Sequence, residues 1–435
     1  MVRIQLLLRS LSPVAFSARR STSNFIDTLD YVPGSALRGA TAARYLREIG
    51  EAPDSRFQAV FVQGEASFGN LYPVRYSRHS FVIPATARSC KAFEGFRSNA
   101  SPDTHGVFDT LMLAASAQAS QDFSQLESIA NCRLCGGDQP THRFCGFYEE
   151  PLVPAEKGNR IHSKTYARVD LNKRHLTHVG INRQSQSAEP GFLYAQQVIS
   201  EAWPDAVKNG DHTDKVLTKF KPQDFSGDLL VSDTQADYVL NTLLETGATL
   251  RLGESRSRGL GKMKVESIAR LESDTEATIR ERILEFNRHL TIKSDHRSQV
   301  EYIALTLQSD AILTDPFLRN SAAVKGEDIS RAFGAGTRSV LINSGDLTLV
   351  YANAERRLAQ SWNVASGYPK SDAIAIAMGA VFLFEVPGRS VEDLLKSLVE
   401  LQESGIGERR SEGFGRVSVC DPFHWEVQEH GNSPS

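Results

Sequence analysis

The chain has 435 residues, 40% of them hydrophobic and 23% charged, with a formal net charge of -3, which is an ordinary composition for a globular protein of two or three domains. The small net charge excludes a polycation, so any nucleic-acid site must be a local basic patch. No apolar run is long enough to span a membrane, and five cysteines are too few for a disulfide framework, which favours a reducing cytoplasm.

The first residues of the chain predict a strand. They include Arg19 and Arg20, and the first acidic residue is Asp27. This composition suits either an organelle transit peptide or a strand at residues 3–8 that leads into a loop. We favour the strand. A secretory signal peptide is not indicated either, because the leucine run at positions 6–8 is far too short for its apolar core.

A helix is expected after Pro33. Gly34 is followed by Ser35, a good N-cap, and by small and apolar residues at helical spacing as far as Leu46. Helix N-termini attract phosphate, and Arg38, one turn into the helix, faces the same end. Gly34, Ser35 and Arg38 are therefore candidate anion-binding residues, and a plain N-cap with a surface arginine is the alternative.

The cysteines predict a metal site. Cys132 and Cys135 are separated by two residues and followed by two glycines, a spacing that lets both thiolates reach one tetrahedral Zn²⁺. Cys145 is the expected third ligand and Cys90 the fourth, with His142 as the alternative to Cys90. Four unrelated thiols are the competing interpretation. A catalytic zinc is not favoured, because four protein ligands leave no open position.

A basic segment follows at residues 172–183. It mixes cationic and apolar residues in a pattern that suits a hairpin with one polar face. A solvated hairpin without a ligand is the alternative. The candidate binding residues in this segment are Lys173, Arg174, His178, Asn182 and Arg183.

A glycine- and arginine-rich motif occurs twice, and we call residues 253–262 loop 1 and residues 407–416 loop 2. Both have glycine at positions one, seven and nine, glutamate second, arginine fourth and a basic residue last. The copies are 154 residues apart (407 minus 253). An amphipathic helix is expected before each copy, at 233–246 and 390–403, and a strand after each. Helix, glycine loop and strand therefore form a duplicated module.

The two loops are candidate anion sites. Glycines permit positive φ and close backbone approach, backbone N–H groups can cradle phosphate oxygens, and arginine or lysine adds charge-assisted hydrogen bonds. A tight turn with solvated arginines is the alternative, and the spacing does not match a nucleoside-triphosphate or dinucleotide loop. The candidate residues are Arg256, Arg258, Gly259, Gly261, Lys262 and Lys264 around loop 1, and Arg409, Arg410, Gly413, Gly415 and Arg416 in loop 2.

The repeat also suggests the domain organisation. Each unit begins with an apolar strand and ends with a glycine loop and a strand. We predict an α+β fold of two tandem ferredoxin-like (RRM-like) domains, at residues 1–268 and 301–425. The first domain has an insertion at about 86–165 that contains the cysteines. A linker helix lies within 269–300, and residues 426–435 form a tail.

Together these motifs resemble the RAMP superfamily of CRISPR effector subunits. A C-terminal glycine-rich loop with basic and aromatic residues is the hallmark of that family, and segments 33–39, 176–183 and 191–194 also resemble it. The combination is most similar to the large two-domain RAMP subunit of type III-D complexes. The resemblance implies ferredoxin-like RAMP domains in a subunit that caps the guide RNA at its 5′ end.

The function implied by the resemblance is that of an RNA-binding structural subunit in antiviral defence. Such a subunit holds the repeat-derived 5′ handle of the guide (CRISPR) RNA, meets target RNA indirectly, and docks the large polymerase-like subunit and the backbone RAMP subunits. The glycine loops, the N-terminal arginines and the basic hairpin would contact the RNA. The alternative is a RAMP-type endoribonuclease acting on guide precursor or target RNA, with Asp27, Asp30 or His105 as candidate catalytic residues. A zinc-stabilised scaffold without RNA contact is a third possibility.

Overall fold

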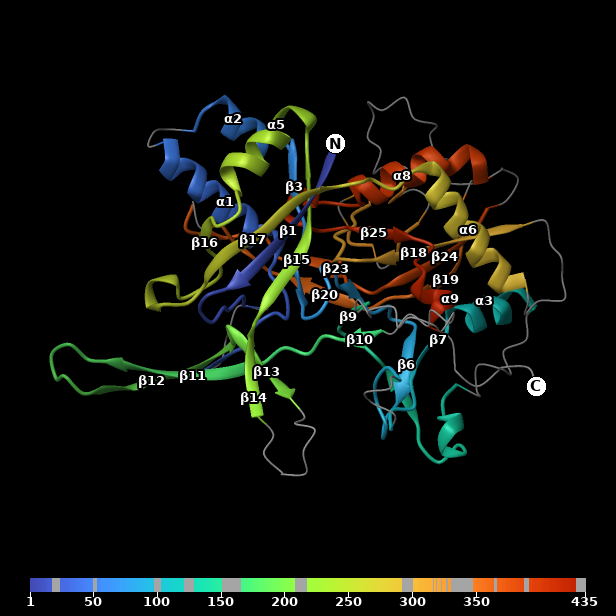
Figure 1. The fold of residues 1–435 in the computed structure, drawn as a ribbon, viewed down its shortest axis with the longest axis horizontal. Helices are drawn as coiled ribbons and strands as arrows, with labels where there is room; N and C mark the ends of the chain where they lie inside the picture. Colours follow the sequence, from blue (N-terminus) through green and yellow to red (C-terminus); the bar gives the residue numbers. More distant parts are fainter. Residues whose placement is uncertain are drawn as a thin grey trace.

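Two antiparallel sheets lie side by side in the computed structural model and form the two halves of the molecule (Figure 1). The N-terminal residues Arg19 and Arg20 and the tail from residue 428 onward lie outside the described residues. The structure describes residues 1–17, 24–49, 53–97, 103–120, 129–150, 166–207, 217–291, 300–315, 347–363, 366–386 and 391–427, and a few residues between 317 and 329.

The first sheet has six strands, β1 (Val2–Ser10), β3 (Ala66–Phe68), β4 (Tyr72–Val74), β15 (Asp224–Val231), β16 (Thr249–Arg251) and β17 (Lys262–Leu271). β1 pairs antiparallel with β15 on one side and β17 on the other, and β3 pairs with the far side of β15. Helix α1 (Gly34–Ile49) follows β1. Helix α5 (Asp233–Tyr238) and its π-helical continuation η3 (Val239–Leu243) follow β15. The four strands of the ferredoxin-like unit are β1, β3, β15 and β17. Numbered 1 to 4 along the chain, they have the spatial order 4-1-3-2.

The second sheet has four strands, β18 (Glu301–Leu307), β19 (Thr348–Asn353), β24 (Val381–Val386) and β25 (Val417–Val419). The turn η5 (Val391–Leu394) and helix α8 (Leu395–Ser404) connect β24 to β25. Here too the order is 4-1-3-2, and all pairs are antiparallel. This order is that of the ferredoxin-like fold, so the predicted α+β architecture of two such units is confirmed.

Each unit has its own apolar core. The predicted helices before the two glycine loops are confirmed, and their apolar stripes pack against the sheets. Burial of one leucine or valine there contributes about 1.5–3 kcal/mol. The predicted first strand is confirmed as well, because every second residue of β1 from Ile4 to Leu8 points into the core. The fully buried apolar residues include Val239, Leu243 and Leu244 before loop 1 and Val391, Leu394, Leu398 and Leu401 before loop 2.

Helix α1 begins earlier than expected. The backbone N–H of Leu37 donates to the carbonyl oxygen of Pro33 over 3.1 Å. Gly34 and Ser35 therefore already lie in the first helical turn, and the expectation that Ser35 is the N-cap is wrong.

Two further helices complete the second core. The expected linker helix is present as α6 (Glu276–Thr291), and it buries Ile279 and Phe286 in the core of the second unit. Helix α3 (Leu111–Ser120) belongs to the segment expected to be an insertion of the first unit, yet Leu111 packs into the same second core. Figure 1 shows α3 at the lower end of α6. Both helices therefore belong physically to the second unit.

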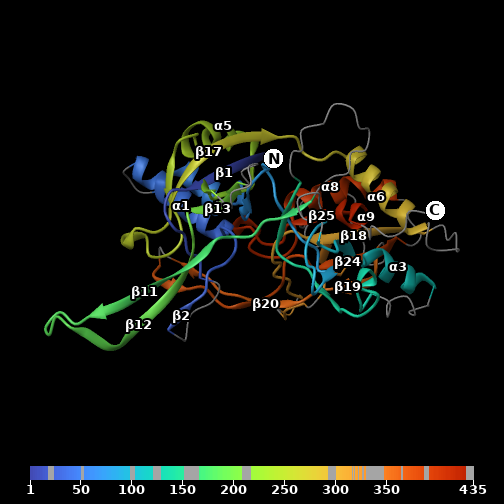
Figure 2. The ribbon, with the colours of Figure 1, turned by 60° about the horizontal axis from the view of Figure 1, so that its bottom comes forward.

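Two hairpins project from the first unit in Figure 1, and the longer one also stands out in Figure 2. The longer one pairs β11 (Lys173–Ile181) with β12 (Ala188–Ile199), and β12 also pairs in parallel with β2 (Phe25–Ile26). The shorter one pairs β13 (Ala202–Val207) with β14 (Leu217–Pro222). The predicted basic segment thus supplies one strand of the longer hairpin, which we call the arm.

Smaller sheets and turns complete the fold. The segment with the cysteines forms a sheet of β6 (Ala87–Cys90), β7 (Val107–Asp109) and β8 (Thr141–Arg143). The other elements are β5 (Phe81–Val82), β9 (Phe147–Glu149), β10 (Ala167–Arg168), β20 (Arg356–Ala359), β21 (Trp362–Asn363), β22 (Tyr368–Pro369), β23 (Ala373–Ile376), α2 (Ser55–Phe57), η1 (Gln58–Val62) and α9 (Phe423–Glu426).

Candidate functional site

The two glycine loops have the same backbone conformation. Ser255 in loop 1 and Arg409 in loop 2 have φ of 52° and 57°, in the left-handed region that non-glycine residues rarely adopt. Each is followed by one 3₁₀ turn, η4 (Arg256–Arg258) or η6 (Arg410–Glu412). The repeated motif therefore corresponds to a repeated structure.

A glycine is needed near the end of both loops. Gly261 and Gly415 have φ of 80° and 74°. A Cβ at these positions would lie 2.0 Å from the carbonyl oxygen of Leu252 and 1.8 Å from that of Ile406. Both glycines therefore allow the loop to close on its own preceding strand or turn, and this role requires no ligand.

Loop 1 lies on the surface. The three residues of η4 and Gly259 are exposed. The Ser255 hydroxyl donates to Gln196 Oε1 on β12 over 3.1 Å, so the loop is anchored to the arm. Among the residues that the structure describes, the Arg256 guanidinium has no carboxylate partner, which leaves its charge available to an anion.

The arm and loop 1 meet through aromatic and polar contacts. The Arg258 guanidinium donates to the hydroxyl oxygen of Tyr194 on β12. The ring of Tyr194 stacks on that of His178 on β11, with centroids 5.0 Å apart. The structure thus brings two separately predicted basic segments to one surface.

Several predicted cations on this surface already have carboxylate partners. Surface ion pairs of this kind are worth about 0–1 kcal/mol, so a phosphate can displace the carboxylate. These cation–carboxylate pairs are Lys264 with Glu266 at 3.6 Å, Arg174 with Glu201 at 3.1 Å, and Lys173 with Asp30.

Three other predicted residues on this surface have no such pair in the described structure. Arg183 and Lys262 are exposed, and the side-chain amide of Asn182 donates to Glu189 near the tip of the arm.

Loop 2 is enclosed between the two units. The Ser67 hydroxyl on β3 donates to the carbonyl oxygen of Arg410 over 2.7 Å, and Arg416 Nη2 donates to the Ser67 hydroxyl oxygen over 3.0 Å. A Cβ at Gly413 would lie 2.8 Å from the carbonyl oxygen of Phe68. Loop 2 therefore joins the second unit to the first sheet.

The N-terminus of α1 is filled by protein groups. The Gly34 N–H donates to Asn70 Oδ1 over 2.9 Å. A Cβ at Gly34 would lie 2.7 Å from the carbonyl oxygen of Glu412, so the glycine allows loop 2 to approach. Arg38 donates to the carbonyl oxygen of Phe61, and its guanidinium lies 3.9 Å from the Glu412 carboxylate. Gly34 and Arg38, two of the three predicted anion-binding residues of α1, thus have protein partners.

Glu412 is the charged centre of this interface. Its carboxylate is buried and pairs with Arg409 at 2.6 Å and with Lys370 at 2.5 Å. Arg409 also donates to the Ser361 hydroxyl oxygen over 2.7 Å and lies 4.8 Å above the ring of Phe414. Burial alone would raise the pKa of Glu412, but the hydrogen bond from Lys370 and the charge of Arg409 outweigh burial and lower the pKa.

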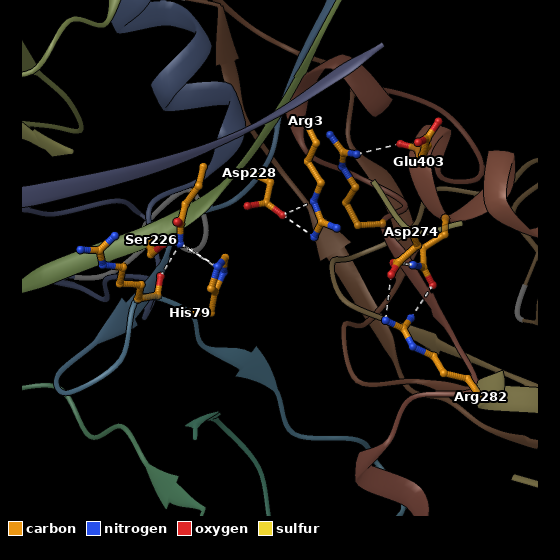
Figure 3. A network of polar contacts seen from close by, with 11 residues as sticks. Arg3, His79, Ser226, Asp228, Asp274, Arg282 and Glu403 are labelled. Atoms are coloured by element: carbon orange, nitrogen blue, oxygen red, sulfur yellow. Dashed lines mark hydrogen bonds and ion pairs between the residues drawn. The ribbon is translucent and has the colours of Figure 1, made fainter. Parts of the chain in front are cut away.

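A polar cavity of about 740 Å³ lies between the two sheets. Figure 3 shows Arg3 with Asp228 and Arg282 with Asp274 along its walls; the two pairs are 2.5 Å and 3.0 Å apart. In the same lining, burial lowers the pKa of Arg416 to about 10. Because these walls pair arginine with carboxylate, the cavity is less suited to a polyanion than loop 1.

A second pocket, of about 970 Å³, lies beside loop 1. Its lining includes Arg47 from α1, Arg251 from β16, Arg256 from loop 1 and Trp362 from β21 of the second unit. Arg47, Arg251 and Trp362 were not among the predicted site residues. No local motif marks them, because only the tertiary structure brings them together.

Three cysteines and one histidine form a cluster around the turn at residues 132–135. The ligand atoms of Cys90, His105, Cys132 and Cys135 all lie within 4.8 Å of one another. Cys90 Sγ lies 3.8 Å from Cys135 Sγ, and His105 Nδ1 lies 3.4 Å from the Sγ atoms of Cys132 and Cys135. Cys90 ends β6, Cys132 directly precedes the turn η2 (Arg133–Cys135), and Cys135 is the last residue of that turn. These four residues can hold a metal ion.

His105 rather than Cys145 completes this cluster, which corrects the predicted ligand set. Cys145 is exposed, whereas the preceding Phe144 is fully buried. Neighbouring residues in extended chain point to opposite sides, so packing of Phe144 turns Cys145 outward. His142, the predicted alternative ligand, lies 3.7 Å from Glu94 instead.

The thiols of the cluster differ in acidity. Burial, together with the hydrogen bond with Cys90, raises the pKa of Cys135 to about 12. Burial also opposes ionisation of Cys90, but backbone N–H groups of Phe93 and Ala92 outweigh burial and lower its pKa. Ionisation of the Cys135 thiol at neutral pH therefore requires a bound cation.

The predicted catalytic candidates have protein partners or lie on the surface. Asp27 and Asp30 are exposed, and Asp30 pairs with Lys173. The His105 ring lies in the thiol cluster and stacks on Phe93, with centroids 4.3 Å apart. Asp30 thus holds the base of the arm, and His105 belongs to the candidate metal centre.

Similar folds occur among solved structures, and no curated protein matches the chain in sequence. A chain in the cryo-EM structure of type III-B Cmr-beta bound to cognate target RNA and AMPPnP is 10% identical, with 88% of this chain and 86% of that chain covered and a TM-score of 0.41. A CRISPR-associated protein Cas6 is 9% identical, with 96% and 98% covered and a TM-score of 0.31. Thermus thermophilus Cas6 is 10% identical, with 45% and 74% covered and a TM-score of 0.27.

None of the helices in the described ranges is long and apolar enough to cross a membrane.

Sequence comparison assigns the family. The family description "RAMP superfamily" matches residues 7–264, which is more than half of the 435 residues. The matched part includes loop 1, the arm and most of the first ferredoxin-like unit. The chain therefore belongs to the RAMP superfamily.

Proposed function

We propose that the chain is an RNA-binding structural subunit of a type III CRISPR ribonucleoprotein effector, most like the large two-domain RAMP subunit of type III-D. In this role it holds the 5′ repeat-derived handle of the guide RNA and docks the large polymerase-like subunit and the backbone RAMP subunits. Membership of the RAMP superfamily supports this class of function. The proposal depends on one observation, the exposed basic loop 1 beside the arm.

Loop 1 is suited to phosphate contacts. Arg256 and Lys262 are exposed, and within the described residues neither has a carboxylate partner. The hydroxyl of Tyr194 holds Arg258 in place, and a guanidinium has five N–H donors, so others remain for phosphate oxygens. Contacts of this kind provide affinity without dependence on base sequence.

The arm is suited to contacts with unpaired bases. His178 stacks on Tyr194, and His175 lies against Phe25 with ring centroids 5.0 Å apart. Single-stranded RNA is recognised largely by stacking of splayed bases on such rings. The handle would therefore lie along the base of the arm, with phosphates at loop 1.

The outer part of the arm is suited to a protein neighbour. Exposed apolar residues gathered on one projecting element are typical of an interaction surface. We assign this surface to a neighbouring subunit of the complex. The exposed apolar residues are Val179, Ile181, Phe192 and Leu193.

Charge reversal in loop 1 tests the RNA surface. For Arg256→Glu with Arg258→Glu we expect the affinity of the full chain for single-stranded RNA to fall about tenfold or more at low salt. The slope of log affinity against log salt should also fall by about 0.7 for each lost phosphate contact. Arg288→Glu, on the exposed face of α6, is the matched control and should leave the affinity unchanged. Equal affinities of the double variant and the control in fluorescence anisotropy would overturn the proposed function.

We also propose that the cysteine and histidine cluster binds structural zinc. With Zn–S of about 2.3 Å and Zn–N of about 2.0–2.1 Å, tetrahedral ligand atoms lie about 3.5–3.8 Å apart. The distances of 3.8 Å between Cys90 and Cys135 and 3.4 Å from His105 to Cys132 agree with this geometry. Four protein ligands complete the coordination and leave no open position. The ion would therefore hold the turn η2 against the end of β6 and support the fold.

Metal analysis of the full chain tests this proposal. We expect about one zinc per chain in mass spectrometry, lost in Cys132→Ser together with a lower thermal midpoint. Cys145→Ser is the matched control and should keep the zinc, because Cys145 is exposed outside the cluster. Zinc that is absent from the native chain, or lost in Cys145→Ser, contradicts the assignment.

A further inference from the structure

The pocket beside loop 1 is built by both units of the chain. Loop 1 contributes Gly253 to Ser257, and α1 contributes Ala40, Ala43 and Arg47, which share one helix face. The second unit contributes Gln360, Ser361 and Trp362. Its volume of about 970 Å³ lies at the upper end of the usual range for small-ligand pockets, about 300–1,000 Å³. The pocket is therefore large enough for one nucleotide with its flanking phosphates.

The pocket has a net positive lining. Arg47, Arg251 and Arg256 face one acidic residue, Glu254, whose carboxylate accepts a hydrogen bond from Gln196 over 3.3 Å. Arg251 Nη1 donates to the carbonyl oxygen of Arg256 over 3.2 Å, which holds the two arginines together. In the part of the chain with described structure, none of the three arginines has a carboxylate partner. A ligand with negative charge would satisfy them.

The pocket also has an exposed aromatic ring. The Trp362 side chain is 56% exposed although indole is a large apolar group. It lies on β21, whose pairing with β22 fixes its position. Next to it, the Ser361 hydroxyl oxygen accepts a hydrogen bond from Arg409 over 2.7 Å. Loop 2 thus supports the wall that faces loop 1, so the two glycine loops together define the pocket.

We infer that this pocket holds one unpaired nucleotide of the bound RNA strand, with its base on Trp362 and its phosphate at Arg251 and Arg256. Base stacking on an indole and charge-assisted bonds to phosphate are the two interactions that the lining offers. The Ser257 hydroxyl can bond to a base edge or to a ribose hydroxyl. The inference rests on the proposed RNA-binding function and adds a defined nucleotide site to it.

Tryptophan fluorescence tests the site on the full chain. The probe is a fluorescein-labelled single-stranded oligouridylate, and anisotropy measures its binding independently of tryptophan. We expect the oligonucleotide to quench the exposed Trp362, whereas Trp203 is buried and Trp425 packs against the second core. Trp362→Ala should remove the quenching and weaken binding about 5- to 100-fold, and Trp362→Phe should restore most of the affinity.

A matched control lies in the same hairpin. Tyr368 on β22 is 72% exposed but does not line the pocket, so Tyr368→Ala should leave affinity and quenching unchanged. Binding with unaltered tryptophan fluorescence and an unaffected Trp362→Ala variant overturns the inference and leaves the proposed function standing. Failure of the wild-type chain to bind RNA overturns both. Free uridine monophosphate that binds as tightly as the oligonucleotide identifies a free nucleotide as the ligand and overturns the assignment to an RNA strand.

Discussion

Gly259 in loop 1 and Gly413 in loop 2 occupy equivalent positions, with φ of 90° and 92°, but their surroundings differ. A Cβ at Gly259 would have no neighbour within 4 Å, whereas a Cβ at Gly413 would meet the carbonyl oxygen of Phe68 at 2.8 Å. The local motif therefore determines the loop conformation. The surface opposite each loop determines whether a ligand can reach it.

The equivalent side chains differ in charge as well. Arg258 of loop 1 is exposed and contacts Tyr194 of the arm, whereas Glu412 of loop 2 is buried between Lys370 and Arg409. An exposed arginine is available to phosphate, but a buried carboxylate requires its own cations. One copy of the module thus suits a ligand, and the other holds the two units together.

Removal of the buried carboxylate should give the largest difference in stability between equivalent positions of the two loops. Glu412→Ala leaves Lys370 and Arg409 without their partner, and loss of one member of a buried ion pair costs about 3–5 kcal/mol. Because both cations keep some contact with solvent, we expect about 2–3 kcal/mol. Arg258→Ala in loop 1 is the matched control and should change the unfolding free energy by less than about 0.5 kcal/mol. Urea unfolding measures both, and equal losses would break the comparison.

The next largest difference is expected for the equivalent glycines. Alanine at positive φ costs about 1–2 kcal/mol at either position. Gly413→Ala adds an overlap with the Phe68 carbonyl, and overpacking of this kind costs about 1–3 kcal/mol more. Gly413→Ala should therefore lower the thermal midpoint of unfolding clearly more than Gly259→Ala does. Equal thermal midpoints of the two variants would mean that the interface around loop 2 rearranges to accept the added methyl group.

The basic residues that end the loops should separate stability from binding. Arg416 donates to Ser67 and to the carbonyl oxygen of Glu403, so Arg416→Ala should cost about 1–3 kcal/mol in urea unfolding. Lys262→Ala, at the equivalent exposed position, should leave stability unchanged and lower the salt slope of RNA binding by about 0.7. A stability loss in Lys262→Ala, or none in Arg416→Ala, would contradict the assigned roles.

The smallest expected effect is a dependence of stability on pH. The pKa of Glu412 is lowered from its ordinary value of 4.5 in the folded chain. Its contribution to stability is therefore present above about pH 4.5 and is lost as the pH falls through the lowered pKa. Glu412→Gln should flatten this part of the curve of thermal midpoint against pH. If the thermal midpoint of Glu412→Gln falls below pH 4.5 as steeply as that of the wild type, Glu412 is not the cause of this pH dependence.

The two ferredoxin-like units were predictable because their signals are local. Alternating apolar residues in β1 and the helical stripe that ends at Leu243 each identify an element and its buried face. The helix within 269–300 was also predicted, but its packing was not. An apolar stripe such as that of Ile279 and Phe286 predicts that one helix face is buried, but it does not identify the surface that covers this face. A linker helix and a core helix therefore have the same pattern in sequence.

The metal centre was predictable in part for a similar reason. Cys132 and Cys135 follow a spacing rule that reflects the reach of two thiolates around one ion. His105 follows no such rule. Antiparallel pairing of β6 with β7, which sets Ser89 opposite Val107, returns the chain beside Cys90 and brings His105 to the thiols.

Local patterns were enough to predict the duplicated module, its glycine-rich loops and two ferredoxin-like units, because backbone sterics and apolar periodicity act over a few residues. Long-range packing leaves loop 1 exposed, encloses Glu412 and Gly413 of loop 2 between the two units, and brings Arg47, Arg251 and Trp362 to one pocket. These outcomes depend on which surfaces face one another across hundreds of residues. No local pattern contains that information.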